Sequence, residues 1–236
     1  VEAIENTLFN KRLHNNIPSP LAFGENYSLH VNDIDENILL NEMLASDIII
    51  TPYNKVRQLS NIICRREIAR RKGVKFNTLP VVGDKIIFVD SMKKTTTVGK
   101  YKMKEVVLPK NMNGVIIAIH DISRVDNLMT IDFQDETNIV HTNIVVSLNY
   151  IMDLTRGADY PRIAYSYAVT VHSSQGGQWD NVLFLDSFWK GDNASQLRYV
   201  GITRAKQRLV VIGGITNATE SDAADRSMLI RVAQMV

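Results

Sequence analysis

Short, continuous apolar runs constrain the fold of this chain more than any other feature. They occupy residues 47–52, 163–171, 182–186 and 209–212. A strand covered on both faces has an unbroken apolar run, and parallel strands flanked by helices are of this kind. Helical patterns precede or separate the runs, at residues 36–45, 54–72 and 194–206. The alternation predicts an α/β domain built on a parallel sheet.

The residue pattern changes in the middle of the chain. From about Leu79 to Val146, β-branched segments alternate with turn residues. They predict strands at residues 85–90, 114–120, 128–133 and 139–146. Short strands at this spacing predict a small antiparallel β barrel. We therefore expect a discontinuous α/β domain, residues 1–77 and 148–236, interrupted by an inserted barrel domain at 78–147.

Local signals set the remaining boundaries. Asn54 is expected to cap the helix at 54–72, and Gly73 to end it. Further helices are predicted at residues 2–13 and 221–235. A loop is predicted at 14–30, because that segment contains two prolines and a glycine.

Composition excludes several classes of protein. Hydrophobic residues make up 45% of the 236 residues and the net charge is +2, which is incompatible with wholesale disorder. No apolar run approaches the roughly 20 residues that span a bilayer, and no signal peptide is evident. Cys64 is the single cysteine, so no internal disulfide forms. The expectation is a cytoplasmic, intracellular protein with no membrane partner.

Basic residues gather in two places, and each has two readings. The group from Arg65 to Lys75 follows a helix flank, where we expect it to be a solvated surface. The lysines between Lys93 and Lys104 lie in a polar segment. They either contact a polyanion or solubilise a loop, and the sequence leaves both open.

Motifs for a self-contained hydrolytic site are absent from the sequence. A Walker A loop needs a glycine five residues before the Gly-Lys-Ser/Thr end, but Gly99-Lys100 precedes Tyr101. The histidines are scattered without metal-ligand spacing, so no metal site is expected. Ser173 and Ser174 lack the context of a nucleophile elbow.

Two segments nevertheless carry chemistry. Residues 167–180 combine a strand with the polar turn 172–177, which suits phosphate oxygens at a sheet edge. In residues 197–211 a helix passes into a strand with Arg204 at the junction. A guanidinium there can neutralise charge on a transferring phosphoryl group. Taken singly, the turn could be an ordinary one and Arg204 a helix cap or ion-pair partner.

Together, the segments Tyr-Ala-Val-Thr-Val-His-Ser-Ser-Gln-Gly-Gly-Gln-Trp-Asp and Leu-Arg-Tyr-Val-Gly-Ile-Thr-Arg-Ala-Lys resemble motifs V and VI of superfamily 1 helicases. They are most similar to the 5′→3′ branch with RecD-type and Dda-type enzymes, which includes the exodeoxyribonuclease V alpha subunit. Residues 50–57 and Asn61 resemble the start of that branch's second RecA-like domain. Residues 79–86, with Asn113-Gly114, resemble the start of its inserted SH3-like barrel.

The resemblance implies the second motor domain of an ATP-dependent DNA helicase acting on single-stranded DNA. Its catalytic residues would be Arg204, as arginine finger, and Gln175. Gly176 and Gln178 would join Arg204 near the nucleotide. The residues expected to face DNA are Thr51, Asn54, Thr170, His172 and Ser173. ATP and Mg²⁺ would be held mainly by an N-terminal RecA-like domain. A chain that opens at Val1 is expected to be a piece of a longer bacterial or phage enzyme, inactive alone.

The sequence departs from the helicase pattern at Ser173, Gln178 and Gly201, where the family commonly has Lys, Glu and Ala. The first departure removes a phosphate-directed charge, and an amide at the second can still bond a ribose hydroxyl. Two alternatives stay open. One is a non-enzymatic nucleic-acid-binding module, and the other is the motor subunit of a helicase–nuclease or replication complex.

Overall fold

The computed structural model describes residues 27–30, 34–98, 101–152, 160–186, 194–212 and 232–235. The chain divides into two compact units, one of Val1–Lys75 with Tyr167–Val236 and the other of Phe76–Ser166. The helix predicted at 2–13 lies outside the described residues. Of the helix predicted at 221–235, only 232–235 is described, and it is helical.

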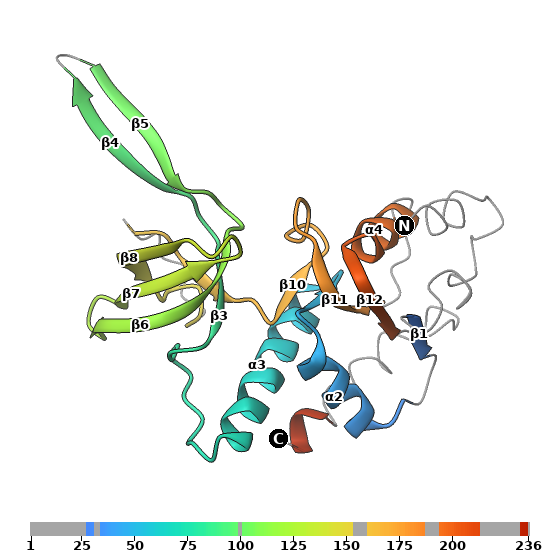
Figure 1. Cartoon of the computed structure of the whole chain (residues 1–236). Helices are drawn as coiled ribbons and strands as arrows, with labels where there is room; N and C mark the ends of the chain where they lie inside the picture. Colours follow the sequence, from blue (N-terminus) through green and yellow to red (C-terminus); the bar gives the residue numbers. More distant parts are fainter. Residues whose placement is uncertain are drawn as a thin grey trace. The chain divides into compact units, whose positions relative to one another are not determined.

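The first unit contains a parallel sheet, labelled in Figure 1. Within the described residues its order is β1 (Tyr27–His30), β12 (Ala205–Ile212), β11 (Trp179–Leu185), β2 (Ile48–Thr51) and β10 (Ala168–Thr170). All neighbours pair in parallel. The α/β class with a parallel sheet is thus confirmed. The prediction of a loop throughout 14–30 was wrong, because the prolines and the glycine all precede β1, which pairs with β12.

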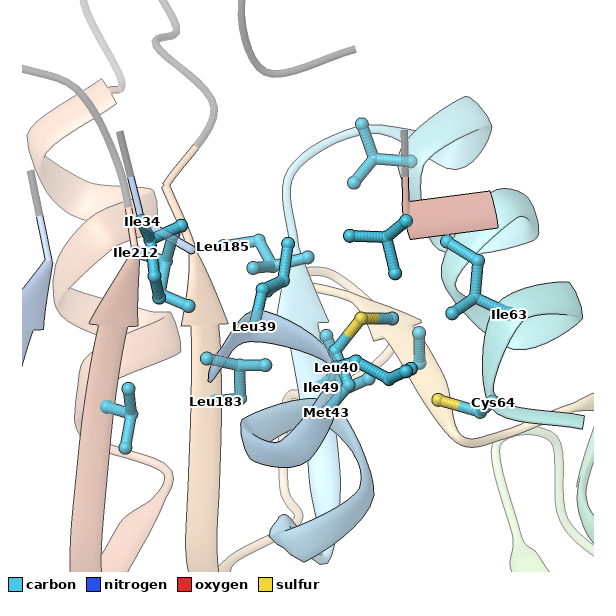
Figure 2. Packing of buried hydrophobic residues seen from close by; sticks show 14 residues of the cluster. Ile34, Leu39, Leu40, Met43, Ile49, Ile63, Cys64, Leu183, Leu185 and Ile212 are labelled. Carbon is cyan, nitrogen blue, oxygen red and sulfur yellow. The ribbon is translucent and has the colours of Figure 1, made fainter. Parts of the chain in front are cut away.

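Helices cover both faces of this sheet. Helices α2 (Glu36–Ala45) and α3 (Asn54–Arg71) contribute Leu39, Met43 and Ile63 to one buried cluster (Figure 2). Leu183 and Leu185 of β11 belong to that cluster. Since side chains alternate along a strand, the intervening Phe184 faces the other side. There it lies against α4 (Ala194–Ile202), as its close approach to Gly201 shows.

The helix ends follow local chemistry. The Asp35 carboxylate caps α2 by accepting hydrogen bonds from the backbone N–H groups of Asn37 and Ile38, at 2.8 and 3.3 Å. Asn54 does not cap α3 as predicted: Tyr53 holds the cap position, and the Asn54 side chain instead accepts a bond from Arg57 Nε. Gly73 ends the helix as expected, with φ +64°. A side chain there would be strained.

The second unit contains an antiparallel sheet. Its described strands run in the order β8 (Val140–Ser147), β7 (Leu128–Asp135), β6 (Asn113–Ser123), β3 (Lys85–Phe88) and β9 (Ile163–Tyr165). Phe88 and Phe133 meet in its core with ring centroids 5.0 Å apart. The four strands predicted for this region are therefore present, with boundaries shifted by a few residues.

The single strand predicted at 163–171 is in fact two strands in two sheets. β9 pairs antiparallel with β3, and β10 pairs parallel with β2. The chain leaves the second unit at Ser166 and enters the first at Tyr167. The second unit consequently extends beyond the expected residue 147, because β9 supplies one of its strands.

The lysine-rich segment forms backbone structure that the sequence did not predict. Strands β4 (Met92–Val98) and β5 (Tyr101–Leu108) pair antiparallel as a separate two-stranded sheet. The register runs from Met92 opposite Leu108 to Val98 opposite Tyr101. The lysines between 93 and 104 therefore belong to a hairpin rather than to an irregular loop.

The first basic group is only partly the solvated surface that was expected. Arg65 is buried. Arg70 and Arg71 both pair with Glu67, at 2.6 and 2.7 Å, and the Glu67 side chain is 0% exposed. The hydrogen bond from Arg70 outweighs burial and, with Arg71, lowers the pKa of Glu67 from 4.5 to about 2. These arginines keep a buried carboxylate charged.

Candidate functional site

The predicted site residues fall at two ends of the parallel sheet. Thr51 and Thr170 are the last residues of β2 and β10, and they lie opposite each other in the pairing register. Arg204 lies at the other end, immediately before β12 begins at Ala205. The carboxyl edge and the amino edge of the sheet therefore carry separate groups.

The strand register gives the separation of these groups. Ile48 of β2 pairs with Val182, so Thr51 lies level with Leu185 of β11. Arg204 lies beside Trp179, whose backbone N–H donates to its carbonyl at 2.9 Å. Six residue steps separate Trp179 from Leu185, and they rise about 20 Å along the strand. The carboxyl-edge threonines and Arg204 therefore lie at opposite ends of the sheet, and the end of the polar turn, at Gly177, reaches Arg204.

The physical reason is the direction of one connection. Because β10 and β11 both run parallel to β2, the chain must return along the sheet between them. Residues 171–178, here called the return segment, make that passage. Its start lies beside Thr170 at the carboxyl edge, and its end lies beside Arg204 at the amino edge. One polar segment thus connects both groups.

At the carboxyl edge, the side chains differ in accessibility. Thr51 is 0% exposed and Thr170 is 9% exposed. The Thr170 hydroxyl donates to Ser173 Oγ at 3.1 Å and accepts from the Ser173 backbone N–H at 3.3 Å. In this arrangement the Thr51 hydroxyl does not reach a ligand. Asn54 and His172 are exposed and Ser173 is half-buried, so these three form the accessible part.

On the side facing away from β2, strand β10 is held by one side chain, that of Asn61. The Asn61 carboxamide accepts from Ala168 N–H and donates to Ala168 C=O, both at 3.0 Å. Its Nδ2 also donates to the carbonyl of Arg57, at 2.9 Å. Asn61 is buried, and among the described strands β10 has no neighbour on the side that Asn61 covers. Asn61 therefore fixes the position of β10, the strand that precedes the return segment.

The return segment is a series of tight turns. The Ser174 hydroxyl donates to Val171 C=O at 2.8 Å and is buried, which closes the first turn. Gly176 has φ +89° and nothing within 4 Å of its added Cβ position. Gln175, Gly176 and Gln178 are exposed. The predicted nucleotide-side residues are thus accessible, on the half of the segment that approaches Arg204.

At the amino edge, Arg204 faces the end of the return segment. One terminal nitrogen donates to Gly177 C=O at 3.2 Å, and Nε donates to Val200 C=O at 2.9 Å. The other terminal nitrogen donates to the Thr203 hydroxyl at 3.1 Å. A guanidinium has five N–H groups. One N–H on each terminal nitrogen is left without a partner among the described residues, in a half-buried position.

Helix α4, which ends two residues before Arg204, is fixed against the sheet at two points. A Cβ added at Gly201 would lie 2.5 Å from Cε2 of Phe184, so the helix backbone packs directly on β11. Asp186, just after β11, accepts from Arg198 Nε at 2.8 Å. Burial raises the pKa of Asp186, and the Arg198 charge opposes this effect.

The roles of several residues in this arrangement could not be predicted from the sequence. Thr203 and Gly177 bond to the Arg204 side chain, and although both lie within the two motif segments, their residue types alone indicated no role for them. Among the described residues no group of three His, Cys, Asp or Glu is placed to hold a metal ion. No helix in the described ranges is long and apolar enough to cross a bilayer.

A family model matches one part of the chain. Residues 165–212 match the UvrD-like helicase C-terminal domain. The match covers β10, the return segment, β11, α4 and β12, and so includes Thr170 and Arg204, whereas Thr51 and Asn54 lie outside it. No curated protein sequence matches the chain.

Solved structures of Pif1 helicases align with the chain at low similarity. Pif1 from Bacteroides with ADP-AlF3 and ssDNA is 13% identical, with TM-score 0.46, covering 92% of this chain and 50% of that one. Bacteroides Pif1 bound to ssDNA is 13% identical, with TM-score 0.42 and coverages of 93% and 50%. Pif1 from Candida albicans is 13% identical, with TM-score 0.41 and coverages of 100% and 58%. The chain thus spans about half the length of these helicases.

Proposed function

We propose that this chain is the second motor domain of an ATP-dependent DNA helicase or translocase that acts on single-stranded DNA. The observation that carries the proposal is the site of Arg204. It lies within the segment that matches a helicase domain, and it retains N–H groups on both terminal nitrogens. A planar cation with free donors suits the oxygens of a transferring phosphoryl group.

In this proposal the two edges of the sheet have different partners. Arg204 acts as the arginine finger at the amino edge, with Gln175, Gly176 and Gln178 near the nucleotide. Asn54, His172 and Ser173 contact the DNA backbone at the carboxyl edge. Small polar groups and backbone N–H groups suit such contacts, because they bind phosphates without reading sequence.

The finer assignments are part of the same proposal. The first unit is RecA-like, and the second is the SH3-like insertion of the RecD and Dda branch. ATP and Mg²⁺ are held mainly by a partner domain that carries a Walker A loop. Support for the residues present here is chemical: exposed amides and a guanidinium can meet ribose hydroxyls and phosphate oxygens. Without that partner domain, we expect the chain to hydrolyse no ATP.

The test is Arg204→Ala in the full-length protein that contains this chain. We expect ATP binding to persist and ssDNA-stimulated hydrolysis to fall by about a thousand-fold or more, the contribution typical of an arginine finger. Lys206→Ala is the matched control, since it removes a nearby exposed charge from β12 and should leave turnover within about twofold.

Two results would contradict the proposal. Near-normal hydrolysis in Arg204→Ala would remove Arg204 from the reaction. DNA binding by the full-length protein with no ATP hydrolysis at all would favour the alternative, a nucleic-acid-binding module without enzymatic activity.

A further inference from the structure

We propose that Thr203 is a positioning residue that fixes the orientation of the Arg204 guanidinium. The inference rests on the proposed function and assigns a role within the same site. It comes from a closed set of hydrogen bonds at the end of α4, where Thr203 and Arg204 both turn back onto the carbonyl of Val200.

The direction of each bond is determined by its donor. The Thr203 hydroxyl donates its one proton to Val200 C=O at 3.2 Å. Its oxygen is therefore only an acceptor toward Arg204, whose terminal nitrogen donates to it at 3.1 Å. Arg204 Nε donates to the same Val200 carbonyl at 2.9 Å. Nε and one terminal nitrogen are thus both tied to the last turn of α4.

The remaining hydrogen bond is made by the other terminal nitrogen of the Arg204 guanidinium. The second terminal nitrogen donates to Gly177 C=O in the return segment, at 3.2 Å. A phosphoryl oxygen bound at this side would compete with a backbone carbonyl, whereas the Thr203 and Val200 contacts could persist. Because they belong to the same helix turn as Arg204, these contacts hold the guanidinium plane while its free N–H groups bind substrate.

A positioning role predicts a specific kinetic signature. Thr203→Val keeps the shape of the side chain but has no hydroxyl, so it releases one terminal nitrogen. Misplacing a catalytic group by about 1 Å costs up to a hundredfold in rate. We expect kcat of the full-length protein to fall by about 10- to 100-fold with KM for ATP unchanged, since the contact acts in the transition state. Thr203→Ser, which keeps the hydroxyl, should restore most of kcat.

Side-chain NMR of this chain supplies a readout that does not depend on activity. With both terminal nitrogens anchored, rotation about the Nε–Cζ bond of Arg204 should be slow. We expect Thr203→Val to increase that rotation rate at least severalfold and Thr203→Ser to leave it slow. The resonance is assigned by its loss in Arg204→Ala, and thermal unfolding of each variant verifies that it is folded.

The outcomes separate the two proposals. Normal kcat and slow rotation in Thr203→Val, with Arg204→Ala inactive, would overturn the role of Thr203 and leave the proposed function standing. A loss in Thr203→Val that Thr203→Ser does not restore would also overturn it, because the hydroxyl would not be responsible. If the unsubstituted protein hydrolyses no ATP with ssDNA, the proposed function fails, whatever the NMR shows.

Discussion

Gly201→Ala should destabilise the first unit, although alanine is the better helix former. The new Cβ would lie 2.5 and 2.9 Å from Cε2 and Cδ2 of Phe184, against a favourable carbon–carbon separation of about 3.5 Å or more. Phe184 is 1% exposed, so its ring lies in the packed interior. Helix or ring must therefore shift by about 1 Å.

The magnitude follows from two opposing terms. Overpacking of a buried contact costs about 1–3 kcal/mol. Replacing glycine by alanine inside a helix contributes about 1 kcal/mol in the opposite direction. The expected net loss is about 0–2 kcal/mol in the free energy of unfolding, toward the upper end because the closest contact is only 2.5 Å. Because Val200 and Gly201 carbonyls both accept bonds from Arg204, the shift would also disturb the guanidinium.

Urea unfolding followed by tryptophan fluorescence measures this loss. Neither tryptophan of the sequence lies in residues 76–166, so the signal does not report on the second unit, and Trp179 begins β11 of the first. The control is a cycle with Phe184→Leu, which provides room for the methyl group. In that background Gly201→Ala should be neutral or stabilising by up to about 1 kcal/mol. Equal losses in both backgrounds, or a gain in the unsubstituted protein, would refute the steric argument.

Three further changes test other parts of the structure. Asn61→Ala leaves the Ala168 N–H and C=O without their partner and should lower the free energy of unfolding by about 2–4 kcal/mol; a loss under about 0.5 kcal/mol in urea would contradict the role given to Asn61. Ser173→Lys should strengthen ssDNA binding and steepen the plot of log K against log salt by about 0.7, the value for one added phosphate contact, whereas Ser173→Gln should not. Glu67 has its pKa lowered to about 2, so it stabilises the folded protein above its ordinary pKa of 4.5, and this contribution is lost as pH falls toward 2. In Glu67→Gln, the acid-induced loss of stability between pH 5 and 2 should be smaller by about 2–3 kcal/mol; identical pH profiles for both proteins would rule out this linkage.

The parallel sheet could be predicted because burial leaves a mark in the sequence. The runs at 48–51, 182–185 and 209–212 are apolar on both strand faces, and all three are central or near-central strands. The run at 163–171 was misread for the same reason. Apolar character shows that a residue is buried but does not show in which sheet, so β9 and β10 were merged.

The sequence indicated which segments contain the candidate site but not how their residues are arranged in space. The segments containing Thr170 and Arg204 were identified from residue types, and both lie in the matched helicase segment. Their placement at opposite edges follows from the shared direction of β10, β11 and β12, because Thr170 ends one strand and Arg204 precedes another. The strand order, with β2 between β10 and β11, could not be read from the sequence. Pairing between distant strands leaves no local pattern, and neither does the burial of Thr51. The hydrogen bond between Ala168 and Asn61 links residues 107 positions apart, and no local sequence pattern predicts such a contact.

The amide of Asn61 also has a consequence for how this protein behaves at high concentration. A strand at the border of a sheet offers its backbone groups to any extended chain that approaches, and this is a common route to aggregation. In β10 the backbone N–H and C=O of Ala168, the first residue of the strand, are already bonded to an internal side chain. With only three residues in the strand, little remains for an intruding chain to bind. One asparagine thus closes this border of the sheet to self-association.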